Sequence, residues 1–154
     1  MVSRTGCSAS ILLKTMRFPI ALLALAGVLV SALALQVHYS TATEPCSINE
    51  KWDCGIVNHS PFAEIFHVPV AALGIAGYLA MAGLALARRR AALSAMAIAG
   101  FAFALYLSHI EKDVLEVWCL YCVISQGIIA IVTLLSLAWL ATEQRARRRR
   151  KALA

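Results

Sequence analysis

The chain has 154 residues, of which 61% are hydrophobic and 14% are charged, and its mean hydropathy is +0.77. This length limits it to one domain, and so apolar a composition excludes an ordinary soluble globular protein. The net charge of +6 does not indicate nucleic-acid binding, because the basic residues lie in separate clusters at the ends of apolar runs.

Four apolar runs follow one another along the chain, each close to the roughly 20 residues that cross a bilayer as a helix. They cover residues 18–37, 69–87, 91–110 and 117–141. The alternative of one long buried helical unit over residues 69–110 would place three arginines at mid-membrane, at about 2.5–3.5 kcal/mol each. The sequence therefore predicts an all-α integral membrane protein, a four-transmembrane-helix bundle over residues 18–141.

Charge predicts the orientation of this bundle in the lipid bilayer. Segment 1–17, the turn 88–90 and the tail 142–154 are basic, whereas the connectors 38–68 and 109–118 are acidic. Because basic residues near spans stay cytoplasmic, we expect both termini and the turn inside and both connectors outside. The tail is expected at an anionic inner leaflet. The first run also resembles a cleavable signal peptide, and cleavage would still leave connector 38–68 outside.

Connector 38–68 is the only connector long enough to form a cap over the bundle. Its residues 61–66, "PFAEIF", are predicted as a short amphipathic helix on the membrane surface. Connectors 88–90 and 109–118 are too short to fold alone.

Four of the five cysteines, namely Cys46, Cys54, Cys119 and Cys122, map to the outer side, where disulfides persist. Cys7 maps to the cytoplasmic side. One interpretation is a non-catalytic membrane assembly subunit with two structural disulfides. A CxxC pair, however, closes too short a loop to stabilise much. At the N-terminal end of the last helix, where the dipole favours a thiolate, it instead indicates redox chemistry.

Cys119, Cys122 and Gln126 share one helical face, with Ser125 beside them, so a polar stripe descends into the bundle. An apolar electron carrier dissolved in the bilayer, such as a quinone, would reach this stripe. A transporter or channel is disfavoured because no run has a charged residue at its centre. A metal site is also disfavoured, because zinc sites with a CxxC usually take a second close pair. His59, near Cys54, is a candidate for tuning a thiol.

Several motifs together resemble the vitamin K epoxide reductase family, in particular its bacterial disulfide-forming members. They are "CSINEKWDC" (46–54) with Ser60 and Phe62 after it, "VPVAALGIAGY" (68–78) and "WCLYC" (118–122), and the likeness covers about residues 15–142. The resemblance implies a quinone, ubiquinone or menaquinone, bound near Cys122. The contacts it implies for the quinone are Ser60, Phe62, Val70, Leu73 and Gln126.

The resemblance also implies a path for electrons in the bacterial inner membrane. A separate periplasmic thioredoxin-fold (DsbA-like) protein would reduce Cys46–Cys54. Cys54 would then attack Cys119 of the inner disulfide, and Cys122 would pass the electrons to the quinone. Animal members bond the vitamin through an asparagine and a tyrosine, where this chain has Val70 and Gln126. A respiratory quinone is therefore expected rather than the epoxide.

Overall fold

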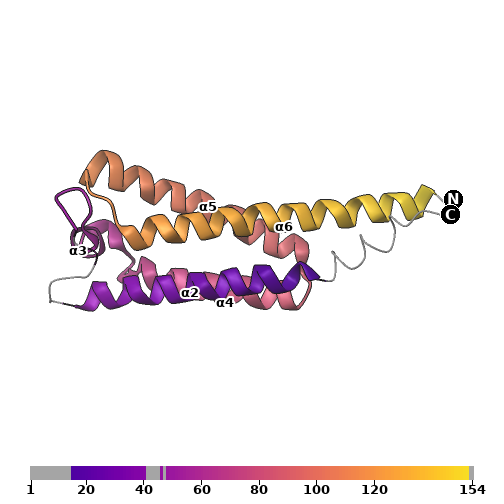
Figure 1. The fold of residues 1–154 in the computed structure, drawn as a ribbon, viewed down its shortest axis with the longest axis horizontal. Helices are drawn as coiled ribbons and strands as arrows, with labels where there is room; N and C mark the ends of the chain where they lie inside the picture. The colour runs from indigo at the N-terminus through magenta and orange to yellow at the C-terminus, as the bar shows by residue number, and fades with distance from the viewer. Residues whose placement is uncertain (1–14, 41–45, 47, 153–154) are drawn as a thin grey trace.

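The computed structural model describes residues 15–40, 46 and 48–152. Four helices run alternately in opposite directions and form the bundle (Figure 1). They are α2 (Arg17–Tyr39), α4 (Val70–Leu86), α5 (Arg90–Ile110) and α6 (Leu120–Ala152). Among the described residues, three stretches are long and apolar enough to cross a membrane, Arg17–Tyr39, Arg90–Leu115 and Leu120–Arg149, and α4 is a shorter apolar helix. The predicted all-α membrane bundle is confirmed.

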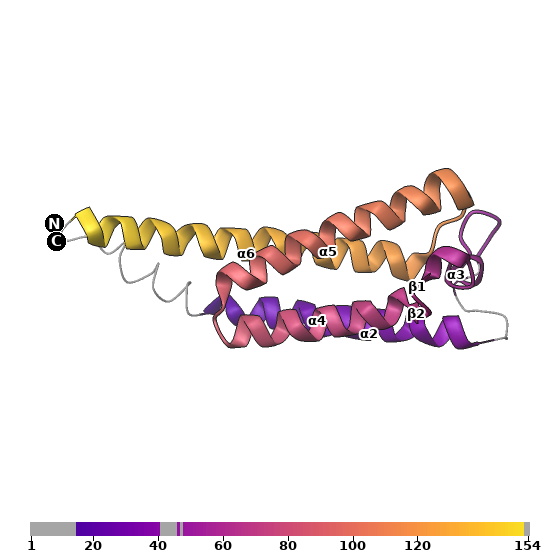
Figure 2. The same cartoon turned by 180° about the vertical axis from the view of Figure 1, so that it is seen from behind.

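Short elements between α2 and α4 form the cap at one end of the bundle (Figure 2). In chain order they are α3 (Cys54–Asn58), the 3₁₀ turn η1 (Pro61–Ala63), β1 (Glu64–Ile65) and β2 (Val68–Pro69). The prediction of an amphipathic helix over residues 61–66 was wrong. Pro61 begins a single turn, and the chain then enters an antiparallel hairpin whose tip, Phe66 and His67, has left-handed φ angles of 52° and 63°.

Small residues allow α2 and α4 to pack closely. A Cβ atom at Gly27 of α2 would lie 2.5 Å from the ring of Tyr78 in α4. A Cβ at Gly74 of α4 would lie 2.8 Å from the hydroxyl of Ser31 in α2. Without hydrophobic driving force in lipid, such close backbone approach supplies the packing contacts that hold helices together.

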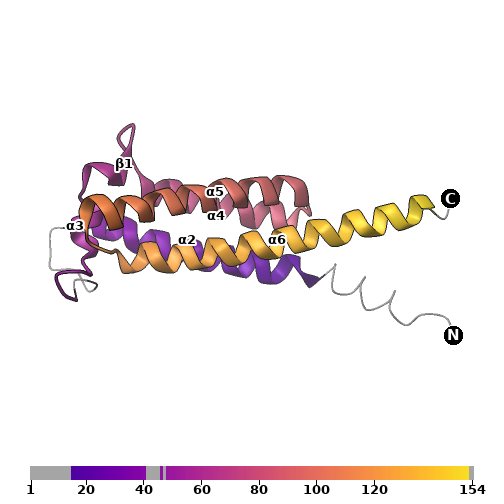
Figure 3. The same ribbon diagram turned by 90° about the horizontal axis from the view of Figure 1, so that it is seen from above.

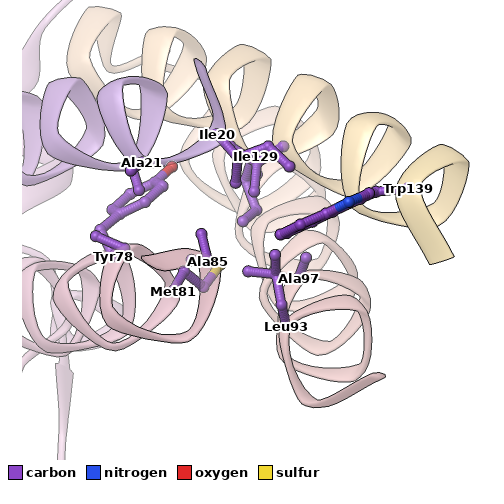
Figure 4. Packing of buried hydrophobic residues seen from close by; sticks show 12 residues of the cluster. Ile20, Ala21, Tyr78, Met81, Ala85, Leu93, Ala97, Ile129 and Trp139 are labelled. Carbon is purple, nitrogen blue, oxygen red and sulfur yellow. The ribbon is translucent and has the colours of Figure 1, made fainter. Parts of the chain in front are cut away.

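The main core lies in the half of the bundle away from the cap. Figure 4 shows how its side chains pack. Ile20, Leu93, Val132 and Trp139 are almost wholly buried there. The Arg90 guanidinium lies 4.6 Å from the centre of the Trp139 ring and pairs with Glu143 at 3.0 Å. These contacts fasten the start of α5 to α6.

The two ends of the bundle differ in charge and in structure. Helix α2 begins at Arg17, the α4–α5 turn holds Arg88 and Arg89, and α6 runs on into the basic residues 145–151, past the other helices (Figures 1 and 3). The cap and the start of α6 form the opposite end. Helix α6 begins at Leu120, three residues after the predicted start of the last span, because the preceding residues pair with the cap.

Candidate functional site

The structure brings the four predicted cysteines together at the cap end. Cys46 and Cys54 form a disulfide, whereas Cys119 and Cys122 are free thiols. Cys46, Cys54 and Cys119 are at most 2% exposed, and Cys122 packs against the cluster that they form. Two thiol couples from distant parts of the sequence therefore lie in one buried cluster.

Backbone pairing between the cap and the start of α6 sets this arrangement. Trp52 forms a parallel bridge with Trp118. The Trp118 N–H donates to the Lys51 carbonyl at 2.8 Å, and the Asp53 N–H donates to the Trp118 carbonyl at 3.1 Å. Since Asp53 precedes Cys54 and Trp118 precedes Cys119, the two bonds hold the two cysteine backbones side by side.

The side chain of Asn58 adds a second link between the couples. Its Nδ2 donates to the Cys54 carbonyl at 2.8 Å and lies 3.6 Å from the Cys119 sulfur. Asn58 is 7% exposed, so its amide needs these partners. The short helix that carries it begins after Asp53, whose carboxylate accepts a hydrogen bond from the Ile56 N–H at 3.0 Å, a standard N-cap.

Cys119 directly precedes the first turn of α6, and the CxxC lies at the helix N-terminus as the sequence predicts. The Cys119 sulfur accepts the Cys122 backbone N–H at 3.4 Å, the position in which an N-cap oxygen usually accepts. The hydrogen bond from the Cys122 thiol, supported by this N–H, lowers the pKa of Cys119 from its ordinary value. This arrangement makes Cys119 more acidic than an ordinary thiol.

A buried carboxyl group completes the surroundings of this pair. Glu111 opens the π-helical turn η2 (Glu111–Leu115) and is 2% exposed. Its Oε2 accepts the Cys119 N–H at 3.2 Å. Its own carbonyl accepts the Val117 N–H at 3.2 Å, which folds the connector back toward α6.

A cavity of about 220 Å³ lies among the four helices and has Cys122 in its wall. Its walls are mostly apolar, with a few polar groups that include Tyr78, Glu111 and Gln126. The Tyr78 hydroxyl donates to the Ser125 carbonyl at 2.8 Å, and the Ser108 hydroxyl donates to Gln126 Oε1 at 2.6 Å. All five residues predicted as quinone contacts line it: Ser60, Phe62, Val70, Leu73 and Gln126.

This cavity suits a quinone ring. Its volume is several times the ~30 Å³ share of one water molecule. Apolar walls with a few placed polar groups are what a planar ring with carbonyl oxygens requires. Cys122 lines this space, whereas Cys119 does not and is buried in the cluster with the cap cysteines.

Asn58 and Glu111 were missed by sequence reasoning. Asn58 follows Cys54 by one helical turn, which is a weak signal, and Glu111 looked like one of several solvated acids in a connector.

His59, expected to tune a thiol, is exposed, bonds to the Gly55 carbonyl at 2.8 Å and lies on an outer groove instead of the cavity. Within residues 15–40, 46 and 48–152, no three His, Cys, Asp or Glu side chains converge as metal ligands do.

A helical membrane bundle with a buried disulfide beside a CxxC dithiol defines a membrane thiol oxidoreductase. The family model of the vitamin K epoxide reductase family matches residues 18–139, and the chain belongs to that family. Its members work with quinone-type electron carriers. No curated protein matches the chain.

Proposed function

We propose that this protein is a quinone-dependent protein-dithiol oxidoreductase that supports disulfide formation. The observation that carries the proposal is one buried cluster that holds both cysteine couples and borders an apolar cavity at Cys122. Its electron donor is a separate periplasmic thioredoxin-fold protein with a reduced dithiol. Its electron acceptor is a membrane quinone, ubiquinone or menaquinone.

In the first step the partner reduces the outer couple. A partner thiolate attacks Cys46, the Cys46–Cys54 bond breaks, and Cys54 leaves as a thiolate. The second partner thiol then releases Cys46, so the partner becomes a disulfide and the outer couple a dithiol. Cys54 is the cysteine placed to react next with Cys119, because its backbone lies beside Cys119 and both residues contact Asn58.

In the second step the outer dithiol reduces the inner disulfide. Cys54 attacks the Cys119 sulfur and Cys122 leaves, which gives a Cys54–Cys119 mixed disulfide. Cys46 then attacks Cys54, re-forms the outer disulfide and frees Cys119. The result is an outer disulfide beside an inner dithiol, the state of the structure. The quinone supplies the sink for the two electrons of this dithiol.

The charge of the two ends supports an orientation for this chemistry. The basic end, with Arg17, the α4–α5 turn and residues 145–151, belongs at the cytoplasmic face of a bacterial inner membrane. Both termini are then cytoplasmic, and the cap faces the periplasm, an oxidising compartment. A periplasm-dependent reporter enzyme fused after Ala154 should be inactive in cells, and an active fusion would contradict this orientation.

The function is tested with purified protein, a reduced thioredoxin-fold substrate and a short-chain ubiquinone or menaquinone analogue. We expect loss of quinone absorbance that requires both proteins and disappears in the Cys119→Ser and Cys122→Ser variants. Cys7→Ser is the matched control and should retain the wild-type rate. Quinone reduction that persists in both inner-couple variants would overturn the proposal.

A further inference from the structure

Glu111 differs from every other acidic residue in the connector before the CxxC. Asp113 and Glu116 are exposed, whereas Glu111 is 2% exposed. None of the ion pairs formed by residues 15–40, 46 and 48–152 includes Glu111. A buried carboxyl without a cationic partner costs free energy. Such a group in a cleft is a candidate for proton chemistry.

The position of this carboxyl relates it to both sulfurs of the inner couple. Oε2 accepts the Cys119 N–H at 3.2 Å, and the carboxyl also interacts electrostatically with the Cys122 thiol. Glu111 and Cys122 line the same cavity. The other ionisable side chains in the cavity wall are His38 of α2, Tyr78 of α4 and Tyr121 of α6.

A purely structural role would not require an acid at this position. An amide oxygen accepts a backbone N–H as well as a carboxylate oxygen does, without the cost of burying a charge. What an acid adds is the capacity to take a proton and return it. Proton transfer by a positioned side chain within hydrogen-bond reach contributes typically about 10²–10⁴-fold to a rate.

We propose that Glu111 carries the proton between the Cys122 thiol and the quinone, an inference that rests on the proposed function. When the Cys119 thiolate and the Cys122 thiol close to a disulfide, two electrons leave with one proton, which Cys122 gives to the Glu111 carboxylate. Glu111 then donates that proton to an acceptor oxygen in the cavity. The second proton of the quinol comes from solvent, because Cys119 has already released its own.

The Glu111→Gln variant tests the inference, because glutamine keeps the size and the oxygen that accepts the Cys119 N–H. We expect quinone reduction to fall by about 100-fold or more, while exchange between the outer and inner couples continues. Glu111→Asp, which keeps an acid, should recover part of the rate. Glu116→Gln removes an exposed charge from the same connector and should leave the rate unchanged.

Two further readouts do not depend on quinone turnover. Oxidation of the reduced inner couple in quinone-free protein should leave the Cys122 proton on Glu111 and so produce a carboxylic-acid C=O band in the infrared difference spectrum, and Glu111→Gln should remove it. The same variant should move the pH midpoint of Cys119 alkylation downward, because the charge that opposes its thiolate is gone. If Glu111→Gln does not fold, the wild-type band and the Glu111→Asp rate decide the matter.

The outcomes separate the two proposals. Absence of any quinone reduction that requires Cys119 and Cys122 in the wild type would defeat the proposed function. If the wild type reduces quinone, two results would overturn the role of Glu111 and leave the function standing. One is a Glu111→Gln variant with an unchanged rate of quinone reduction and an unchanged pH midpoint of Cys119 alkylation. The other is the absence of the carboxylic-acid band in the wild type.

Discussion

Trp52 of the cap and Trp118 before the CxxC are paired backbone to backbone, and their rings lie 6.4 Å apart between centroids. The pairing joins two segments that are 66 positions apart in the sequence. It is the structural reason why one cysteine couple can reach the other.

Trp118→Pro should slow exchange between Cys54 and Cys119. Proline removes the N–H that donates to the Lys51 carbonyl at 2.8 Å, a bond worth about 0.5–1.5 kcal/mol. We expect a loss of about threefold to tenfold in the rate at which these two cysteines cross-link after Cys46 and Cys122 are changed to serine. Trp118→Ala keeps the N–H and serves as the control. Equal slowing in both variants would assign the effect to the ring instead.

The reactivity of Cys119 should depend on its partner in the CxxC. The Cys122 thiol lowers the pKa of Cys119 by donating to its sulfur. In the reduced protein, alkylation of Cys119 should therefore continue below the pH at which an ordinary thiol becomes unreactive. Cys122→Ala removes the donor, so the midpoint should move to higher pH, and Cys122→Ser, which keeps a hydroxyl donor, should move it less. An unchanged midpoint in Cys122→Ala would contradict this assignment.

Filling the cavity from α4 should weaken quinone binding without affecting the cysteines. A Cβ atom at Gly77, which lines the cavity, meets no atom within 4 Å, so a larger side chain enters open space. Gly77→Leu should raise KM for the quinone by about tenfold or more, which corresponds to roughly 1.4 kcal/mol. Reduction of Cys46–Cys54 by the partner should be unchanged.

Gly83→Leu is the matched control for Gly77→Leu. A Cβ at Gly83 also meets nothing within 4 Å, but Gly83 does not line the cavity. Its KM should equal that of the wild type. A Gly77→Leu variant with wild-type KM would place the quinone elsewhere.

Gly27→Ala should destabilise the bundle. The added methyl group would lie 2.5 Å from the Tyr78 ring, so either this ring, whose hydroxyl is bonded to the Ser125 carbonyl, or the packing of α2 on α4 must shift. Overpacking of this kind costs about 1–3 kcal/mol, and the thermal midpoint in detergent should fall. Gly83→Ala, in open space, should leave the midpoint unchanged or raise it. A midpoint for Gly27→Ala as high as that of Gly83→Ala would mean that Tyr78 is free to turn aside.

Apolar run length predicted the membrane helices well, because each run is long and lipid leaves the backbone few other choices. The end of the first span was placed at Val37 and lies at Tyr39, and the start of the third was placed at Ala91 and lies at Arg90. The length of an apolar run gives no information about backbone pairing between connectors. Because of that pairing, α6 begins at Leu120 and not at the predicted Val117.

The five residues predicted to contact a quinone line one cavity because the family resemblance already encodes the fold. Glu111 carried no such signal. Its burial depends on a π-helical turn that folds it under Cys119, and charge pattern alone places it among solvated acids. The hairpin at residues 64–69 was missed because left-handed Phe66 and His67 are unusual turn residues.

The central claim is that Cys54 passes electrons to Cys119, and a trapping experiment tests it most directly. In a Cys46→Ser, Cys122→Ser variant the two remaining cysteines of the site have no other partners there. Mild oxidation in membranes followed by peptide mapping should yield a Cys54–Cys119 disulfide in most molecules. The companion variant Cys54→Ser, Cys122→Ser should yield little Cys46–Cys119 disulfide. Free Cys54 and Cys119 after oxidation, or equal cross-linking in both variants, would contradict the account.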